Sequence, residues 1–270
     1  MSSPEDIQDF AIGSGFSDFG AFVYSGFKHD EEEEEADIAP LVSVIVCAEE
    51  EEEERWLKCY SNKQSILLVG EGDFSFSASL AKEFGSAANV VATSLNSRRF
   101  LQKNYEKARD NIQTLTSRGA KVLHGVDGTK MATHSSFQHL KFDRIVFNFP
   151  LNGFFRDESR ESQLRRYRKF VRLFMANAKK MIKIDGEIHI THKSYGFYLE
   201  WNLEEIGSQQ GLKLLEEVPF SHLDYPGYRT KFGFGGDDNF CCYPCKTYKF
   251  GLKRSRSKRR NKNKIKSKIV

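Results

Sequence analysis

The sequence predicts an α/β fold built on a seven-stranded, mostly parallel sheet that contains one antiparallel strand. Two observations predict this class. Five short apolar runs are each followed by a segment with helical spacing, and right-handed crossovers of this kind build a parallel sheet. The last two apolar runs follow one another without an intervening helix, so one of them is expected to run antiparallel.

The first unit begins at residues 66–69, a continuous apolar run typical of a central strand that is covered on both faces. Gly70 and Gly72 follow it and allow a sharp turn with exposed backbone. Ser75 or Ser77 can cap the helix that comes next. Such a unit often opens a nucleoside-cofactor site, but a turn with only two glycines fits a plain tight connection equally well.

The other elements follow in order along the chain. Six further strands are predicted at residues 89–94, 121–126, 142–149, 187–191, 212–220 and 241–250. Helices are predicted at residues 97–117, around 135–140, at 159–183 and at 198–210. Asp185-Gly186 is expected to turn the chain into the strand at 187–191. This order is the pattern of a Rossmann-like class I methyltransferase rather than of a dehydrogenase with six parallel strands.

Polar residues interrupt the apolar runs where the predicted strands end. They lie at residues 70–73, 94–97, 127, 148–151 and 191–193. Ligands of open α/β sheets bind outside the carboxyl ends of the strands. The sequence therefore predicts a ligand site at this edge of the sheet.

Charge is distributed unevenly and suggests three segments. Residues 1–54 carry a net charge of −16 and are expected to be mostly disordered, although the apolar patch at 41–48 can form an edge strand or a docking segment. Residues 55–250 form the predicted globular domain with a net charge of +10, and residues 251–270 form a basic, disordered tail. This excess of positive charge favours RNA or DNA as a partner over a purely solubilising surface, and the acidic segment can mask it in cis.

Several function classes are disfavoured by composition. An odd count of five cysteines without a secretory leader favours reduced thiols in a cytosolic or nuclear compartment. Cys242-x-x-Cys245 offers half of a zinc site, but no second ligand pair stands nearby, so no metal is expected. No apolar run approaches the roughly 20 residues that a membrane span needs.

Several motifs together resemble one family. The segments ILLVGEGDFSFS, NVVATSLNS, VLHGVD, FDRIVFNFP, GEIHITHK, YPGY and KTYKF, within residues 56–250, resemble the 25S rRNA (uridine-N3)-methyltransferase-like domains in their plant form. The resemblance implies a Rossmann-like fold and S-adenosylmethionine as the methyl donor. It also implies the N3 atom of a uridine in large-subunit rRNA as acceptor, and a place in the nucleus or nucleolus.

The glycine turn is expected to bind the amino-acid end of S-adenosylmethionine. Gly70 and Gly72 allow close backbone approach, and Glu71 or Asp73 can accept hydrogen bonds from the cofactor's ammonium group. Ser75, in the same turn, is included in the predicted cofactor site.

Two later strand ends complete the predicted cofactor site. Asn96 stands where the family pattern has an aspartate that grips the ribose hydroxyls, which predicts weaker binding by roughly ten- to hundredfold. Asp127 either accepts a hydrogen bond from the adenine amino group or forms an Asx turn with the two residues that follow it.

The predicted reaction centre is Asn148-Phe149-Pro150, which resembles the Asn/Asp-Pro-Pro-aromatic motif of amino-group methyltransferases. The Asn148 amide can bond both a uracil carbonyl and the N3–H group. Because that proton must leave before transfer, a base is required, and His192 is the candidate. His189 is interpreted as a satisfied core histidine. Leu151 replaces the histidine that usually follows the family motif.

The remaining candidates concern RNA. Lys193 is expected to hold a uracil oxygen or a phosphate. Tyr225 and Tyr228 are expected to stack on a flipped base while Arg229 and Lys231 meet the phosphates, although an ordinary hairpin tip explains this loop as well.

Two other functions remain open. Asn96 and Leu151 also fit a methyltransferase-like RNA-binding protein that has lost catalysis. A nicotinamide-dependent oxidoreductase has less support, because the turn lacks the third glycine of the dinucleotide fingerprint.

Overall fold

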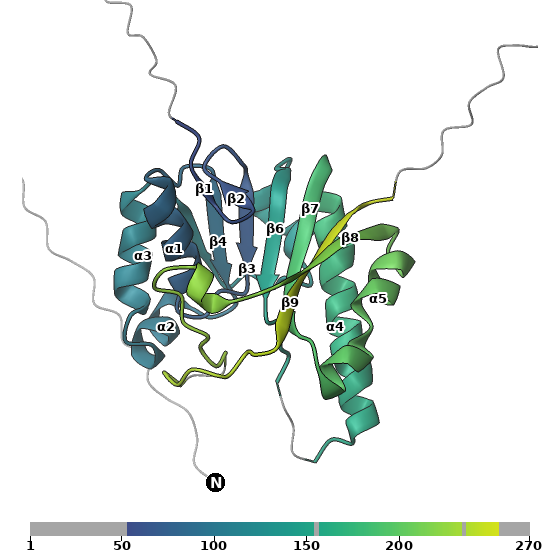
Figure 1. The fold of residues 1–270 in the computed structure, drawn as a ribbon. Coiled ribbons are helices and arrows are strands. Elements are labelled where there is room, and N and C mark those ends of the chain that lie inside the picture. The colour runs from purple at the N-terminus through teal and green to yellow at the C-terminus, as the bar shows by residue number, and fades with distance from the viewer. Residues whose placement is uncertain (1–52, 154–156, 234–235, 254–270) are drawn as a thin grey trace, which may run out of the picture. The chain divides into compact units, whose positions relative to one another are not determined.

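The computed structural model describes residues 53–153, 157–233 and 236–253 (Figure 1). They all belong to one compact unit, Glu51–Val270. The apolar patch at 41–48, most of the acidic segment and the basic tail from residue 254 onward lie outside the described residues. The three-segment division of the chain stays a prediction.

Seven strands of the described chain form one sheet, and two short strands form a separate hairpin. The strands are β1 Trp56–Leu57, β2 Tyr60–Ser61, β3 Ile66–Val69, β4 Val90–Ser94, β5 Lys121–His124, β6 Phe142–Asn148, β7 Ile182–Lys193, β8 Leu212–Pro219 and β9 Cys245–Leu252. The α-helices are α1 Ser75–Phe84, α2 Arg98–Asn104, α3 Ala108–Ser117, α4 Arg160–Met181 and α5 Leu203–Gln209, and the 3₁₀ turns are η1 Met131–Thr133, η2 Ser135–Phe137, η3 Gly196–Trp201 and η4 His222–Asp224.

The order of the large sheet is β5-β4-β3-β6-β7-β9-β8. Neighbouring strands from β5 to β7 pair in parallel, whereas β9 is antiparallel to both β7 and β8. This topology confirms the predicted seven-stranded, mostly parallel sheet with one antiparallel strand. It also places β3, with the glycine turn that follows it, in the middle of the sheet.

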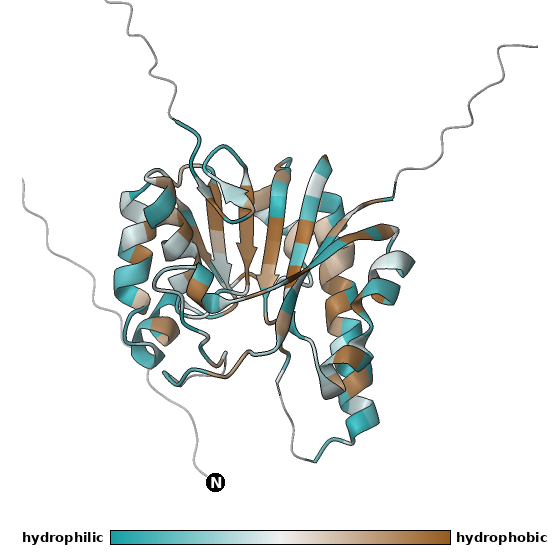
Figure 2. Ribbon diagram, viewed as in Figure 1, coloured by the Kyte–Doolittle hydropathy of each residue, from teal (hydrophilic) through white to brown (hydrophobic). Residues whose placement is uncertain are grey.

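Helices cover both faces of the sheet (Figure 2). The side chains of β3 alternate between the two cores that result. Ile66 and Leu68 belong to the core under α1 and α3, whereas Leu67 and Val69 belong to the core under α4 and α5. All four β3 side chains are buried, as the continuous apolar run predicts.

Three predicted helices are interrupted. The segment 97–117 is two helices, because Tyr105 after α2 is extended (φ −133°) and buries its ring. The helix predicted around 135–140 is a pair of 3₁₀ turns, and the one at 198–210 consists of η3 and α5, separated at Asn202.

Two further boundaries differ from the prediction. Asp185-Gly186 does not turn the chain before a strand but lies within the long strand β7, at a register shift opposite β6. The last strand begins at Cys245 rather than at residue 241.

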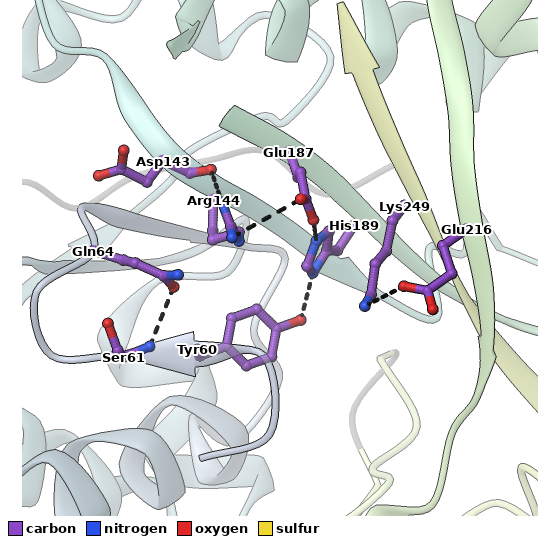
Figure 3. A network of polar contacts seen from close by, with 9 residues as sticks. All are labelled: Tyr60, Ser61, Gln64, Asp143, Arg144, Glu187, His189, Glu216 and Lys249. Carbon is purple, nitrogen blue, oxygen red and sulfur yellow. Dashed lines mark hydrogen bonds and ion pairs between the residues drawn. The ribbon is translucent and has the colours of Figure 1, made fainter. Parts of the chain in front are cut away.

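The β1–β2 hairpin, which the periodicity did not predict, is held to the sheet by a buried polar chain (Figure 3). The hydroxyl of Tyr60 lies 2.9 Å from Nδ1 of His189, and Nε2 of His189 lies 2.8 Å from Oε2 of Glu187. Glu187 also pairs with Arg144 at 3.9 Å. Burial lowers the pKa of His189, so the ring is neutral; Nε2–H donates to Glu187 and the Tyr60 hydroxyl donates to Nδ1. The interpretation of His189 as a satisfied core histidine is confirmed.

We expect Tyr60→Phe to lower the free energy of unfolding by about 1–3 kcal/mol, because it leaves a buried ring nitrogen of His189 without a partner. Urea titration followed by circular dichroism measures this change. Tyr243→Phe, at a tyrosine that is 82% exposed, is the matched control and should leave stability unaltered. Equal stability of the two variants would contradict the role of the Tyr60 hydroxyl.

Within the described residues no helix has the length and apolar character needed to cross a membrane. The same residues contain no group of three or more His, Cys, Asp or Glu side chains suited to hold a metal ion.

Candidate functional site

A cavity of about 380 Å³ opens at the carboxyl ends of β3, β4, β5 and β6, at the lower ends of the strand arrows in Figure 1. This volume falls within the usual range for small-molecule sites. The lining residues come from the turns after these strands, from α4 and from the loop before β9. Among them are Gly70, Glu71, Gly72, Asp73, Asn96, Asp127, Asn148, Phe149, Leu151, Tyr228, Arg229, Lys231, Phe232 and Phe240. Most of the predicted cofactor residues therefore share one cavity.

The two glycines of the turn have different roles. Gly70 has φ +70°, and a Cβ atom there would lie 2.3 Å from Cε2 of Phe147, so only glycine fits. At Gly72 the nearest atom to an added Cβ would be Cβ of Lys231 at 3.9 Å. Gly70 thus allows the strand end to pack on Phe147, whereas Gly72 leaves open space in the cavity wall.

Glu71 caps the helix that follows the turn. Its Oε2 accepts hydrogen bonds from the backbone N–H of Ser77 at 3.1 Å and from the Ser77 hydroxyl at 2.8 Å. The residue at the start of α1, Phe74, makes no side-chain cap bond. Burial raises the pKa of Glu71 to about 7. The expected serine cap is therefore replaced by a carboxylate four residues before the helix.

Asp73 is the second carboxylate of the turn. Its Oδ1 accepts from the backbone N–H of Ser75 at 2.9 Å, but Oδ2 is buried with no hydrogen-bond partner among the described residues. Burial raises the pKa of Asp73 as well. The sequence left the ammonium acceptor open between Glu71 and Asp73, and the free oxygen favours Asp73.

We expect the stability of the protein to depend on pH through Glu71. Its pKa is about 7 in the folded chain against 4.5 as the ordinary value, so the folded state binds this proton more tightly. The resulting stabilisation is complete below about pH 4.5 and is lost as pH rises through 7, a change of up to ~3 kcal/mol.

Glu71→Gln removes this titration while its side-chain oxygen still accepts from Ser77. Urea unfolding between about pH 5 and pH 8 should therefore show the variant gaining stability relative to the wild-type chain as pH rises. The difference in unfolding free energy between the two proteins reports on Glu71 alone, because the buried histidines titrate in both of them. If the unfolding free energies of the two proteins changed in parallel with pH, the pKa of Glu71 would be the same in the folded and unfolded chain, against the prediction.

Ser75 does not line the cavity. Its hydroxyl accepts from the backbone N–H of Arg229 at 3.0 Å and lies 3.4 Å from the Arg229 carbonyl. The structure therefore assigns Ser75 to holding the loop before β9 against the glycine turn, in place of the predicted contact with the cofactor.

Asn96 and Asp127 both line the cavity. The Asn96 backbone carbonyl lies 3.3 Å from Nδ1 of His124, and the residue lines the cavity. Asp127 forms an Asx turn, the second of the two roles that the sequence left open. Its Oδ1 accepts hydrogen bonds from the backbone N–H and the hydroxyl of Thr129, at 2.9 and 2.7 Å. Its other oxygen lies 3.9 Å from Lys130.

Asn148 ends β6 at the cavity with both amide atoms buried and without a hydrogen-bond partner among the described residues. An unsatisfied buried amide is costly, which makes Asn148 a candidate to bind a ligand. Phe149 has φ +49°, a strained conformation for this residue type, and its N–H donates to the Thr191 carbonyl at 2.8 Å. Pro150 lines a second, smaller cavity of about 50 Å³ beside the first.

His192 faces away from the main cavity and lines only the smaller one. Its Nδ1–H donates to the Lys193 carbonyl at 2.9 Å. Its ring packs on that of Trp201, with the two centroids 4.1 Å apart. Burial lowers the pKa of His192 to about 4, which makes the imidazole a weak proton acceptor. Both observations argue against the prediction that His192 removes the uracil proton.

The predicted RNA contacts separate into two groups. Tyr228, Arg229 and Lys231 line the main cavity, and Lys193 lines the smaller one. Tyr225 lines neither, because its ring is buried and stacks on Phe220 with centroids 5.5 Å apart. The prediction that Tyr225 stacks on a base is corrected: the residue belongs to the core.

The sequence reasoning missed four phenylalanines of the cavity wall: Phe147, Phe170, Phe232 and Phe240. Phe147 and Phe170 follow the apolar patterns of β6 and α4, which indicate packing and not a ligand. No local signal points to the other two, which reach the cavity because their loop returns over the glycine turn. The hydroxyl of Tyr105 donates to the Phe232 carbonyl at 2.6 Å and holds that loop.

The residues present fit S-adenosylmethionine, the cofactor that the sequence predicts. The free Oδ2 of Asp73 suits an ammonium group, and Gly72 leaves space beside it. Asn96 and Asp127 supply polar groups at the neighbouring strand ends, where ligands of such sheets bind.

The family model described as BMT5-like, rRNA (uridine-N3-)-methyltransferase BTM5-like, matches residues 67–232. The heavy metal-associated isoprenylated plant protein 41 of Arabidopsis thaliana is 45% identical over 203 residues, which are 74% of this chain but 39% of that protein. An uncharacterized protein of Arabidopsis thaliana is 46% identical over 202 residues, which are 73% of this chain and 97% of that protein.

Solved structures are similar only in outline. NSun6 from Pyrococcus horikoshii aligns with a TM-score of 0.47 and 15% identity over 72% of this chain and 49% of that chain. The sequence relatives and the family model identify the chain far more closely. The chain belongs to the BMT5-like family, whose model is described as rRNA (uridine-N3-)-methyltransferase BTM5-like.

Proposed function

We propose that the chain is an S-adenosylmethionine-dependent methyltransferase that modifies N3 of a uridine in large-subunit rRNA. The observation that carries this proposal is Asn148, whose buried amide atoms lack a hydrogen-bond partner in the described part of the chain and which lines a cavity suited to the cofactor. Family membership supports the reaction class and the acceptor atom.

The cofactor supplies an electrophilic methyl group on a sulfonium centre. Asp73 holds the ammonium end through its free Oδ2, and Gly72 allows close approach there. Asn96 would orient the nucleoside end from the next strand end, whereas the side chain of Asp127 is held in its Asx turn. Phe149 and Phe240, whose centroids are 5.0 Å apart, help to exclude water from the wall between the two cavities.

Asn148 orients the acceptor. Its amide Oδ1 accepts a hydrogen bond from the N3–H of uracil, while its Nδ2 donates to an adjacent carbonyl oxygen. Before the methyl group is transferred, the N3 proton passes to solvent water and N3 becomes the nucleophile, while Nδ2 of Asn148 still holds the neighbouring carbonyl oxygen. Orientation of this kind is a large contribution to transfer between two bound molecules.

The charge of the chain supports an RNA substrate. Residues 55–250 carry a net charge of +10, and cations at the cavity, Arg229 and Lys231, suit a phosphate backbone. An rRNA substrate in turn favours action in the nucleus or nucleolus.

The second candidate is an RNA-binding protein of this fold that has lost catalysis. Asn96 favours it, because a carboxylate can accept from both ribose hydroxyls and an amide oxygen with its neighbouring N–H₂ cannot.

Calorimetry of the full chain with S-adenosylmethionine tests the proposal first. We expect one saturable site, and transfer of a tritiated methyl group to rRNA that lacks its own modifications, recovered as N3-methyluridine after digestion. No heat at millimolar cofactor would favour the RNA-binding alternative. Label recovered on another atom would refute the proposed acceptor.

A further inference from the structure

A row of aromatic rings leads away from the main cavity over the surface. Phe232 and Phe240 have centroids 5.6 Å apart, and Lys193 places Nζ 5.3 Å from the centroid of Phe240. The same Nζ lies 5.2 Å from the centroid of Tyr198, which is 5.7 Å from that of Tyr195. We call these four rings and the lysine the aromatic strip.

The aromatic strip is continuous with the proposed site. Phe232 and Phe240 line the main cavity, and the smaller cavity is lined by Phe240, Lys193 and Tyr198. Both ends of the strip are open, because Phe232 is 46% and Tyr195 is 41% exposed. Both rings therefore keep part of their surface available to a ligand.

We infer that the aromatic strip binds unpaired nucleotides next to the acceptor uridine, so that the substrate is a single-stranded RNA segment and not a duplex. This inference rests on the proposed function, because it takes the acceptor base to lie at the main cavity. Bases of a single strand offer their faces to aromatic side chains, and a cation among the rings meets the phosphates. Bases inside a duplex are already stacked and offer no free face.

The test measures binding of a fluorescent, uridine-rich oligonucleotide of about 12 nucleotides, alone and annealed to its complement, by anisotropy. We expect the full chain to prefer the single strand. Tyr195→Ala should weaken that binding by about tenfold, since one base stack contributes about 1–3 kcal/mol. Tyr195→Phe keeps the ring and should bind as the wild-type chain does.

Two further variants sharpen the test. Trp56→Ala removes a ring that is 54% exposed on β1, outside the aromatic strip, and should leave binding unaltered. Lys193→Gln should lower the slope of log affinity against log salt by roughly 0.7, the value for one phosphate contact on a single strand.

Equal affinity of Tyr195→Ala and the wild-type chain for the single strand would overturn the inference, and so would a preference for the duplex. Either result would leave the aromatic strip as a surface for a protein partner. Tyr195 lines neither cavity, so calorimetry with S-adenosylmethionine should be unaltered in its variants. Failure of the wild-type chain to bind the cofactor would instead refute the proposed function. The affinities for the single-stranded and the annealed oligonucleotide could still be compared.

Discussion

Asn148→Ala is expected to reduce methyl transfer to rRNA by at least about a hundredfold, the loss typical of removing one positioned hydrogen-bonding group from a reaction centre. The free energy of unfolding should be the same in the variant as in the wild-type chain. Both amide atoms of Asn148 are buried without a protein partner, so the variant breaks no hydrogen bond among the described residues. Loss of activity at unaltered stability is the signature of a side chain kept for its ligand.

Asn148→Asp is the matched variant, because it keeps an oxygen that accepts from uracil N3–H but loses the N–H₂ donor. We expect intermediate activity from it. Tritium transfer measures the three proteins, calorimetry confirms that each still binds S-adenosylmethionine, and thermal unfolding checks their stability. Wild-type transfer by Asn148→Ala would refute this reaction centre, while a large loss of thermal stability would show that the amide serves the fold.

The inner part of the sheet could be predicted from the sequence because β3 is a continuous apolar run. The run at 66–69 has buried side chains on both faces and the predicted bounds of β3. Long-range contacts could not be predicted in this way. The loop that brings Phe232 and Phe240 to the cavity is held by Tyr105, which is 127 residues from Phe232 in sequence.

One error in the candidate site could have been avoided. His192 was placed in the cleft because it is a polar residue at a strand end. It follows Ile188 and Ile190 at a spacing of two residues, and both isoleucines are fully buried under α4 and α5. Side chains two apart on a strand share a face, so the period of the strand already placed His192 on the covered side.

The assignment of Tyr225 failed for a different reason. The local sequence around a Pro-Gly turn does not show whether a neighbouring tyrosine exposes its ring for stacking or buries it in a core. The structure buries Tyr225 against Phe76, which is far away in the sequence, and against Phe220, which lies five residues before it. The glycine turn was easier to predict, since the residues that form it are consecutive in sequence.

Gly72→Arg is expected to abolish saturable binding of S-adenosylmethionine. Gly72 lines the cavity, so a long side chain there competes with the cofactor for the same space. The new guanidinium also competes for the free Oδ2 of Asp73 and repels the cationic cofactor. Calorimetry should show no heat beyond dilution.

Gly72→Ala separates the effect of the cavity from that of the turn. Its Cβ meets Lys231 at an ordinary contact distance, so the fold and most of the cofactor affinity should survive. Gly70→Ala, two residues earlier, should destabilise the fold instead, because its Cβ would overlap the ring of Phe147 at a positive φ. Wild-type affinity in a folded Gly72→Arg chain would mean that the cofactor binds elsewhere, and the cavity would then lose its assigned role.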